Sequence, residues 1–183
     1  GAAFLSACAA YTVGAGLVQI YTASENRLAL QELLPEAIIS CYDSYDDNQL
    51  SRLLDWADVV CIGCGLGMGQ ISEKILKNVL KNVSCPCVID ADGLNLLNGK
   101  IELLNQCRAP VILTPHMKEM SRLTGWSIDK IMEDRFQALD QIIKQSEPDT
   151  KSSIICVLKD SRTVVAQTNR QKFVNLAGNN SMA

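Results

Sequence analysis

Three short groups of polar and glycine residues could carry chemistry, and each directly follows an apolar run. The first is Asp90-Ala91-Asp92-Gly93-Leu94-Asn95, which follows residues 88–89. Two carboxylates and an amide at this spacing could hold a hydrated magnesium ion or contact a hydroxyl group. Asp92 could instead cap the next short helix, and only one of the two acidic residues is needed as a cap. The sequence therefore leaves both a functional and a structural role open here.

The second group contains the single histidine of the chain. Thr114-Pro115-His116 follows the apolar run 111–113. Pro115 favours an extended backbone before it, and Glu119 begins the next helix, so His116 is expected at the tip of a strand. A lone histidine is more often structural, but the other polar strand ends beside it favour a proton-transferring or hydrogen-bonding role.

The third group is the loop Gly63-Cys64-Gly65-Leu66-Gly67-Met68-Gly69, which follows residues 59–62 and precedes a helix. The free amides at the start of a helix could hold an anion, so a phosphate or dinucleotide site is one interpretation. Glycines at strand ends also serve tight turns and close packing. The spacing matches neither the Rossmann fingerprint nor the P-loop.

Short apolar, β-branched runs alternate with helical patterns along the chain. Strands are expected at 17–21, 37–40, 59–62, 88–89, 111–113 and 154–158. Helices are expected at 3–13, 25–34, 71–80, 119–124 and 127–145, the last of them capped by Ser127.

Several of these runs are apolar throughout, as strands buried on both faces of a parallel sheet require. The pattern predicts an α/β fold with a mostly parallel, doubly wound sheet flanked by helices. Residues 159–163 are expected to join 154–158 to 163–167 as an antiparallel edge hairpin. Ligands bind at the carboxyl ends of parallel strands, which is where the three groups lie.

Composition favours one compact domain over residues 1–183. The chain is 48% hydrophobic and carries a formal net charge of −3 with scattered basic residues, so a nucleic-acid partner is not expected. No apolar run approaches the roughly 20 residues that cross a bilayer, and the first residues lack a basic leader. We therefore expect a cytoplasmic protein without a membrane partner.

The eight cysteines include Cys61-x-x-Cys64 and Cys85-x-Cys87, whose number, but not spacing, suits a four-thiolate zinc site. Cys61 and Cys87 lie in apolar runs, where thiols act as small buried hydrophobes in a reducing cell. No protein metal site is predicted from them.

Taken in order, five motifs resemble the NAD(P)H-hydrate dehydratase family over the whole chain. They are Gly1–Leu5, Gly14–Val18, Gly63–Gly67, Asp90–Asn95 and Thr114–Leu123. The resemblance implies a ribokinase-like fold, a homotetramer, and dehydration of the S epimer of hydrated NADH or NADPH. The implied chemistry is phosphorylation of the C6 hydroxyl and loss of phosphate, with Mg²⁺ and with ADP in bacteria or ATP in eukaryotes. Histidine after Thr-Pro resembles the bacterial members, which favours ADP.

The resemblance also implies residue roles. Contact with the hydrated nicotinamide nucleotide falls to Ala2, Ala3, Gly65, Gly67, Asp90, Asn95, His116 and Glu119. Contact with the phosphate donor falls to Lys159, Asp160, Ser161, Arg162 and Thr163. The chain departs from the family at Cys64, usually proline, at Met117-Lys118, often Pro-Gly, and at Asp160, where Lys-Gly is usual.

The family's Gly-Thr-Gly-Asp or Gly-Ser-Gly-Asp loop, with its general base, is expected beyond Ala183, and a further strand before Gly1. Phosphoryl transfer needs a positioned base and stabilised charge, so the segment alone is expected to be an inactive part of a longer protein. Two alternatives stay open. One is a small-molecule kinase of the hydroxyethylthiazole or hydroxymethylpyrimidine type, and the other is a non-catalytic nucleotide-binding domain.

Overall fold

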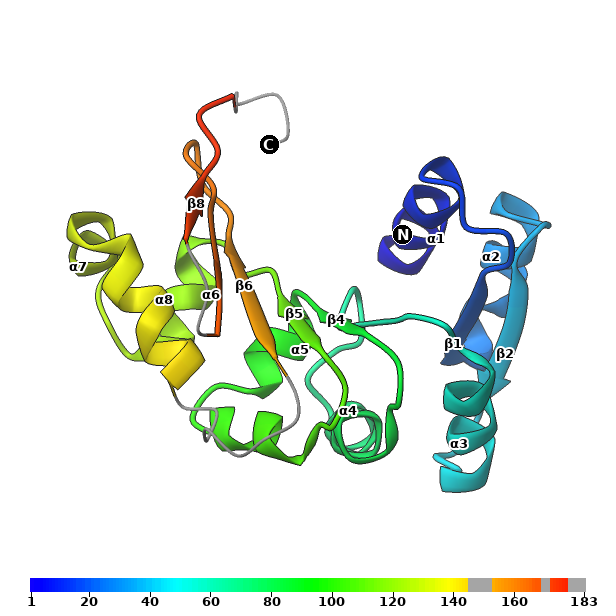
Figure 1. Cartoon of the computed structure of the whole chain (residues 1–183). Coiled ribbons are helices and arrows are strands. Elements are labelled where there is room, and N and C mark those ends of the chain that lie inside the picture. The colour runs from blue at the N-terminus through cyan, green and yellow to red at the C-terminus, as the bar shows by residue number, and fades with distance from the viewer. Residues whose placement is uncertain (145–152, 169–171, 178–183) are drawn as a thin grey trace. The chain divides into compact units, whose positions relative to one another are not determined.

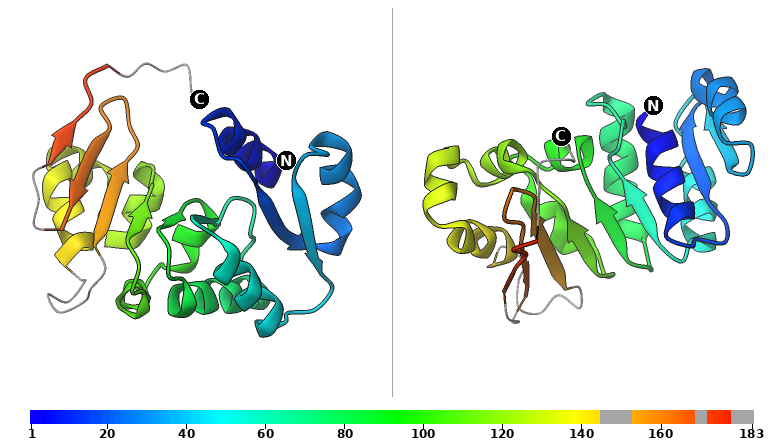
Figure 2. Two further views of the ribbon diagram at one scale, coloured as in Figure 1. Left: turned by 45° about the vertical axis from the view of Figure 1, so that its right-hand side comes forward. Right: turned by 90° about the horizontal axis from the view of Figure 1, so that it is seen from above.

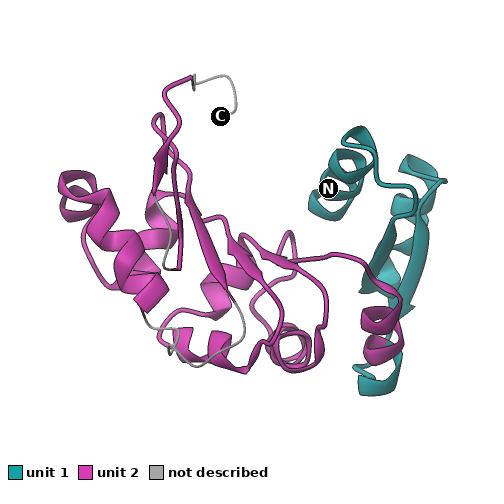
Figure 3. Cartoon of the chain, viewed as in Figure 1, with its two compact units in different colours: residues 1–49 teal, residues 50–183 magenta. Residues whose placement is uncertain are grey.

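The computed structural model describes residues 1–144, 153–168 and 172–177. Two compact units divide the chain, residues 1–49 and residues 50–183, which Figure 3 shows in teal and magenta. Helix α3 (Asp47–Trp56) crosses the boundary between them. The single ribokinase-like domain over residues 1–183 stays a prediction, and each unit is described by itself.

Unit 1 is a small α/β layer. Its elements are α1 (Ala2–Thr12), β1 (Gln19–Ala23), η1 (Ser24–Asn26), α2 (Arg27–Leu33) and β2 (Ile38–Tyr42). Strands β1 and β2 pair in parallel, from Gln19 opposite Ile38 to Ala23 opposite Tyr42. The core of this unit consists of Ala7, Ile20, Leu30 and Ala37.

Unit 2 holds a six-stranded sheet in the order β3-β4-β5-β6-β7-β8 (Figure 1). Its strands are β3 (Val60–Ile62), β4 (Cys87–Ile89), β5 (Val111–Leu113), β6 (Ile154–Leu158), β7 (Val164–Gln167) and β8 (Phe173–Val174). Strands β3 to β6 are parallel, whereas β7 and β8 are antiparallel to their neighbours. The mostly parallel sheet with an antiparallel edge hairpin is therefore confirmed.

Helices flank this sheet, as Figure 2 shows in two further views. They are α4 (Gln70–Asn82), α5 (Asp92–Leu96), η2 (Ile101–Gln106), α6 (Met117–Thr124), α7 (Ile128–Glu133) and α8 (Arg135–Lys144). Helix α4 buries Ile75, Leu76, Val79 and Leu80, an apolar stripe at helical spacing. Central strand residues such as Ile89 and Leu113 are fully buried, which matches the apolar runs that predicted them.

The predicted helix over 127–145 is wrong as a single helix. Ser127 does cap its start, since its side chain accepts a hydrogen bond from the Lys130 amide at 3.2 Å. The chain breaks at Asp134, whose carboxylate accepts a hydrogen bond from the Gln137 amide at 2.9 Å. Asp134 therefore starts a second helix, α8, as an aspartate can at a helix start. Residue 145 lies outside the described residues.

Helix α3 and strand β8 had no counterpart in the sequence prediction. Among the residues that the structure describes, no helix is long and apolar enough to cross a membrane.

Candidate functional site

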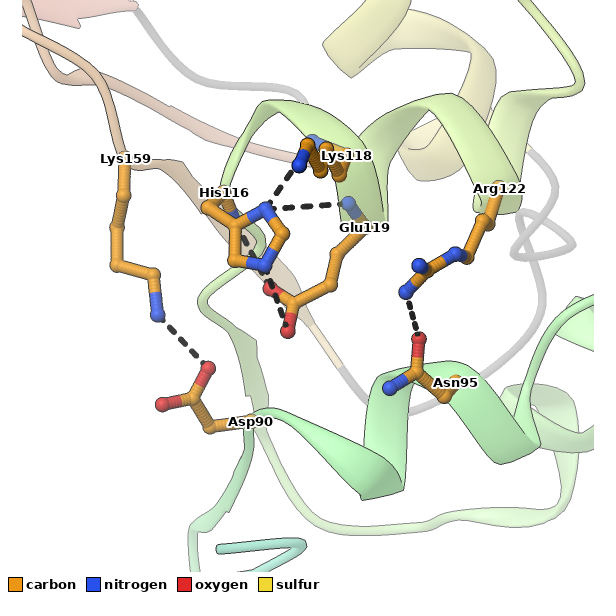
Figure 4. Close-up of polar contacts among 7 residues, drawn as sticks. All are labelled: Asp90, Asn95, His116, Lys118, Glu119, Arg122 and Lys159. Carbon is orange, nitrogen blue, oxygen red and sulfur yellow. Dashed lines mark hydrogen bonds and ion pairs between the residues drawn. The ribbon is translucent and has the colours of Figure 1, made fainter. Parts of the chain in front are cut away.

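Three neighbouring parallel strands bring their polar ends to one edge of the sheet in unit 2. Asp90 follows β4, His116 follows β5, and Lys159 follows β6 (Figure 4). The backbone amide of Lys159 donates to the Pro115 carbonyl at 2.8 Å, and His116 and Lys159 form a parallel bridge beyond the regular strands. The pairing of β5 with β6 is thereby prolonged into the site.

Asp90 and Lys159 form an ion pair across the end of β5. The Lys159 Nζ lies 2.8 Å from Asp90 Oδ1, and the two side chains are 40% and 27% exposed. Burial of the carboxylate acts to raise its pKa, but the Lys159 ammonium together with other hydrogen bonds to the carboxylate outweighs this and holds the pKa of Asp90 below its ordinary value. Asp90 is therefore ionised near neutral pH.

His116 begins α6 through a capping box. Its Nδ1 accepts hydrogen bonds from the amides of Lys118 at 3.0 Å and Glu119 at 3.3 Å, while Glu119 Oε2 accepts from the His116 amide at 2.9 Å. Because Nδ1 is an acceptor, the neutral ring carries its proton on Nε2, which lies 3.3 Å from Glu119 Oε1. Both ring nitrogens thus have protein partners, although the side chain is 48% exposed.

Two further predicted residues are already engaged within the protein. Glu119 is only 5% exposed and serves the capping box. The Asn95 side chain on α5 accepts a hydrogen bond from Arg122 of α6 at 2.7 Å, as Figure 4 shows. Arg122 lies in the resembling segment Thr114–Leu123 but was not predicted as a site residue.

The glycine loop 63–69 is held by Asp92. The Gly67 amide donates to Asp92 Oδ2 at 2.8 Å, and the Ser72 hydroxyl donates to the Leu66 carbonyl at 2.7 Å. Asp92 is the first helical residue of α5, and the N-cap position is occupied by Ala91. The structural alternative of a helix cap is therefore wrong, because the carboxylate instead links the β4–α5 turn to the glycine loop.

This link brings two backbone segments into direct contact. A Cβ on Gly63 would lie 1.8 Å from the Asp90 carbonyl oxygen and 2.6 Å from the Gly93 nitrogen, and Gly63 has φ +117°. Between them Ala91 has φ 51° and ψ −118°, a conformation that costs a residue with a side chain about 1–3 kcal/mol. The sequence analysis predicted no role for Ala91 or Gly93. The glycine in each of the two segments was the only local sign that their backbones approach closely.

The loop 159–163 after β6 carries a second ion pair. Asp160 Oδ2 lies 2.8 Å from Arg135 Nη2 at the start of α8. The Arg135 guanidinium holds the pKa of Asp160 below its ordinary value. Thr163 donates to the Asp160 carbonyl at 3.1 Å, which closes the loop on itself. Arg135 was not predicted, because its distance from Asp160 in sequence gave no sign of the contact.

Ala2 and Ala3 lie in the first turn of α1 in unit 1, and Ala3 packs against the core of that unit. Their contact with the substrate stays a prediction. Cys87 is buried as expected, with burial raising the pKa of its thiol to about 12. Cys61 is exposed, which contradicts the prediction, because it lies on β3 at the outer edge of the sheet.

A family model described as NAD(P)H-hydrate dehydratase matches residues 1–183. The chain belongs to this family. It is 38% identical over its whole length to a bifunctional NAD(P)H-hydrate repair enzyme of Coxiella burnetii, of which it covers 35%. It is 36% identical to an ADP-dependent (S)-NAD(P)H-hydrate dehydratase of Streptococcus thermophilus, with 91% of this chain and 57% of that protein covered.

Solved structures of similar proteins share the fold of this chain. An ADP/ATP-dependent NAD(P)H-hydrate dehydratase of Bacillus subtilis, co-crystallised with ATP and Mg²⁺, matches with a TM-score of 0.73 and 25% identity over 98% of this chain and 60% of that one. A ribokinase-like superfamily protein of Enterococcus faecalis matches with a TM-score of 0.76 and 27% identity, over 98% and 59%. The ribokinase-like fold is therefore confirmed, and the chain spans about a third of its bifunctional relatives.

Proposed function

We propose that the protein containing this chain dehydrates the S epimer of hydrated NADH or NADPH, with ADP or ATP as phosphate donor. Family membership over all 183 residues carries this proposal. The Streptococcus thermophilus relative bears the name of an ADP-dependent dehydratase, which favours ADP as donor. The three polar strand ends of unit 2 support it, because ligands of parallel α/β sheets bind at this edge.

The chemistry follows in two steps. The C6 hydroxyl oxygen bonds to the terminal phosphorus of the donor while the bond from that phosphorus to the bridging oxygen breaks, and the hydroxyl proton passes to a general base. Phosphate then leaves with the C6 oxygen, and a neighbouring proton is lost as the ring double bond returns. We assign the general base to no residue of this chain.

On this proposal the described residues bind and orient the reactants. Gly65, Gly67, Asp90, Asn95, His116 and Glu119 face or support the hydrated nicotinamide nucleotide. His116 would contact the substrate through its exposed ring edge. Glu119 and Asn95 would support the site indirectly, by fixing α6 against its neighbours. The distinction follows from burial, since Glu119 is 5% exposed and the His116 side chain 48%.

The loop Lys159–Thr163 would lie along the phosphate donor. The Lys159 ammonium is 40% exposed and could turn from Asp90 to a phosphate group without leaving the strand end. A lysine binds phosphate as a point charge on a flexible stem, which suits a group that changes partner.

Magnesium is supported less directly. Among residues 1–144, 153–168 and 172–177, no three acidic, histidine or cysteine side chains gather as a metal site. Asp90 pairs with Lys159 in this structure. We therefore derive no step through Mg²⁺ from this chain. We further propose that the full protein is a cytoplasmic homotetramer, on the family resemblance alone.

Recovery of the near-ultraviolet absorbance of the reduced nicotinamide ring tests the proposal. The full-length protein is incubated with separated S and R epimers of hydrated NADH, with Mg²⁺ and either ADP or ATP. We expect recovery from the S epimer only, with release of inorganic phosphate. A protein that leaves both epimers unchanged but phosphorylates a thiazole or pyrimidine alcohol would instead be a kinase of the same fold.

A further inference from the structure

Asp160 places a carboxylate inside the loop that, on the proposed function, receives the phosphate donor. It directly follows Lys159 and lies where the family resemblance leads us to expect glycine. A carboxylate beside phosphate groups repels them, and the repulsion is stronger where water is partly excluded. The Asp160 side chain is 24% exposed, so its charge is only partly screened by solvent.

Arg135 offsets that charge from the start of α8. Its Nη2 lies 2.8 Å from Asp160 Oδ2, and its own side chain is 25% exposed. Its Nη1 donates to the Met132 carbonyl at 3.1 Å, so the guanidinium is fixed at the junction of α7 and α8. Lys159 pairs with Asp90 in this structure and Lys172 pairs with Asp140 at 2.7 Å, so neither of these ammonium groups is the ion-pair partner of Asp160.

We propose that Arg135 is a positioning residue that neutralises Asp160 and so allows an anionic nucleotide to occupy the loop 159–163. The inference rests on the proposed function, which assigns the donor to this loop. Arg135 acts through Asp160 and needs no contact with the nucleotide. Its loss therefore matters only while the carboxylate is present, which makes the idea testable as a pair of substitutions.

The experiment uses the full-length protein. It measures the turnover number kcat, the KM for each nucleotide, ADP and ATP, and the KM for the hydrated cofactor. Calorimetric titration of ADP in the absence of hydrated cofactor measures nucleotide binding independently of catalysis. The variants are Arg135→Gln, Asp160→Asn, the double variant and Arg135→Lys. Lys172→Gln is the matched control, because it breaks an ion pair of similar length and exposure that joins α8, through Asp140, to the residue before β8, outside the loop.

Arg135→Gln is expected to raise nucleotide KM about tenfold, the effect of one uncompensated charge several ångströms from a phosphate. The kcat and the KM for hydrated cofactor should change little. Asp160→Asn should keep or lower nucleotide KM, and the double variant should match Asp160→Asn. Arg135→Lys should restore most of the binding, and Lys172→Gln should behave as the parent.

A double variant as weak as Arg135→Gln would overturn the inference, since Arg135 would then act by shaping the loop. If Arg135→Gln does not fold, Asp160→Asn alone decides. A higher nucleotide KM in Asp160→Asn would contradict the inference, because removal of a carboxylate that only repels the nucleotide cannot weaken nucleotide binding. A parent protein that binds no nucleotide in the titration would refute the donor assignment itself. The two failures are therefore distinguishable.

Discussion

Replacing Gly63 by alanine tests the backbone contact that builds the site. The new Cβ would lie 1.8 Å from the Asp90 carbonyl oxygen and 2.6 Å from the Gly93 nitrogen. Both neighbours are backbone atoms, so no side chain can rotate away. Overpacking costs about 1–3 kcal/mol, and forcing φ +117° on alanine adds about 1–3 kcal/mol.

We expect the full-length Gly63→Ala protein to lose about 2–6 kcal/mol of unfolding free energy, or roughly 10 °C in Tm. Gly125→Ala is the matched control in the same unit, because Gly125 has φ +71° but no atom within 4 Å of its added Cβ. It should lose only about 1 kcal/mol. Urea unfolding followed by circular dichroism measures both. Equal losses in the two variants would refute the steric argument.

Three further outcomes follow from the site. Asp90→Asn should cost about 1 kcal/mol near neutral pH, given the partly exposed pair. The pKa of Asp90 in the folded protein lies below its ordinary value of 3.8. The stabilisation by the ion pair is therefore present above pH 3.8 and is lost as the pH falls through the lowered pKa. The urea midpoints of the variant and the parent should then converge in acid. His116→Ala should lower turnover and should also lower the unfolding free energy by about 1 kcal/mol. His116→Asn keeps an oxygen that can cap the helix, so it should lower only turnover. Full turnover by the asparagine variant would mean that His116 serves only as a helix cap. Ala91→Gly should raise unfolding free energy by about 1 kcal/mol because it relieves φ 51°, and an unchanged midpoint would show that the turn is unstrained.

The strands were predictable because their signal is local. Runs such as 111–113 and 154–158 match β5 and β6 in bounds, since a strand buried on both faces must be apolar throughout. The polar residues directly after these runs, Asp90, His116 and Lys159, were predictable as strand-end residues for the same reason. Parallel strands share one edge at which their carboxyl ends meet.

The contacts among those residues were not predictable, because they depend on strand order and side-chain direction. The sequence gives no sign that Lys159 reaches past β5 to Asp90, or that Arg135 meets Asp160. The break at Asp134 was missed because the apolar pattern of α7 and α8 is nearly continuous, while the cap that separates them is one side-chain hydrogen bond.

The sequence by itself determined the fold class, the family resemblance and the places along the chain where chemistry could occur, since periodicity and local motifs are written in consecutive residues. Only the tertiary structure decided which of those places touch. It linked the Asp92 carboxylate to the glycine loop, and it paired Asp90 with Lys159 and Asp160 with Arg135. Such partnerships arise from residues far apart in sequence, and the free energy that selects them exists only once the sheet has formed.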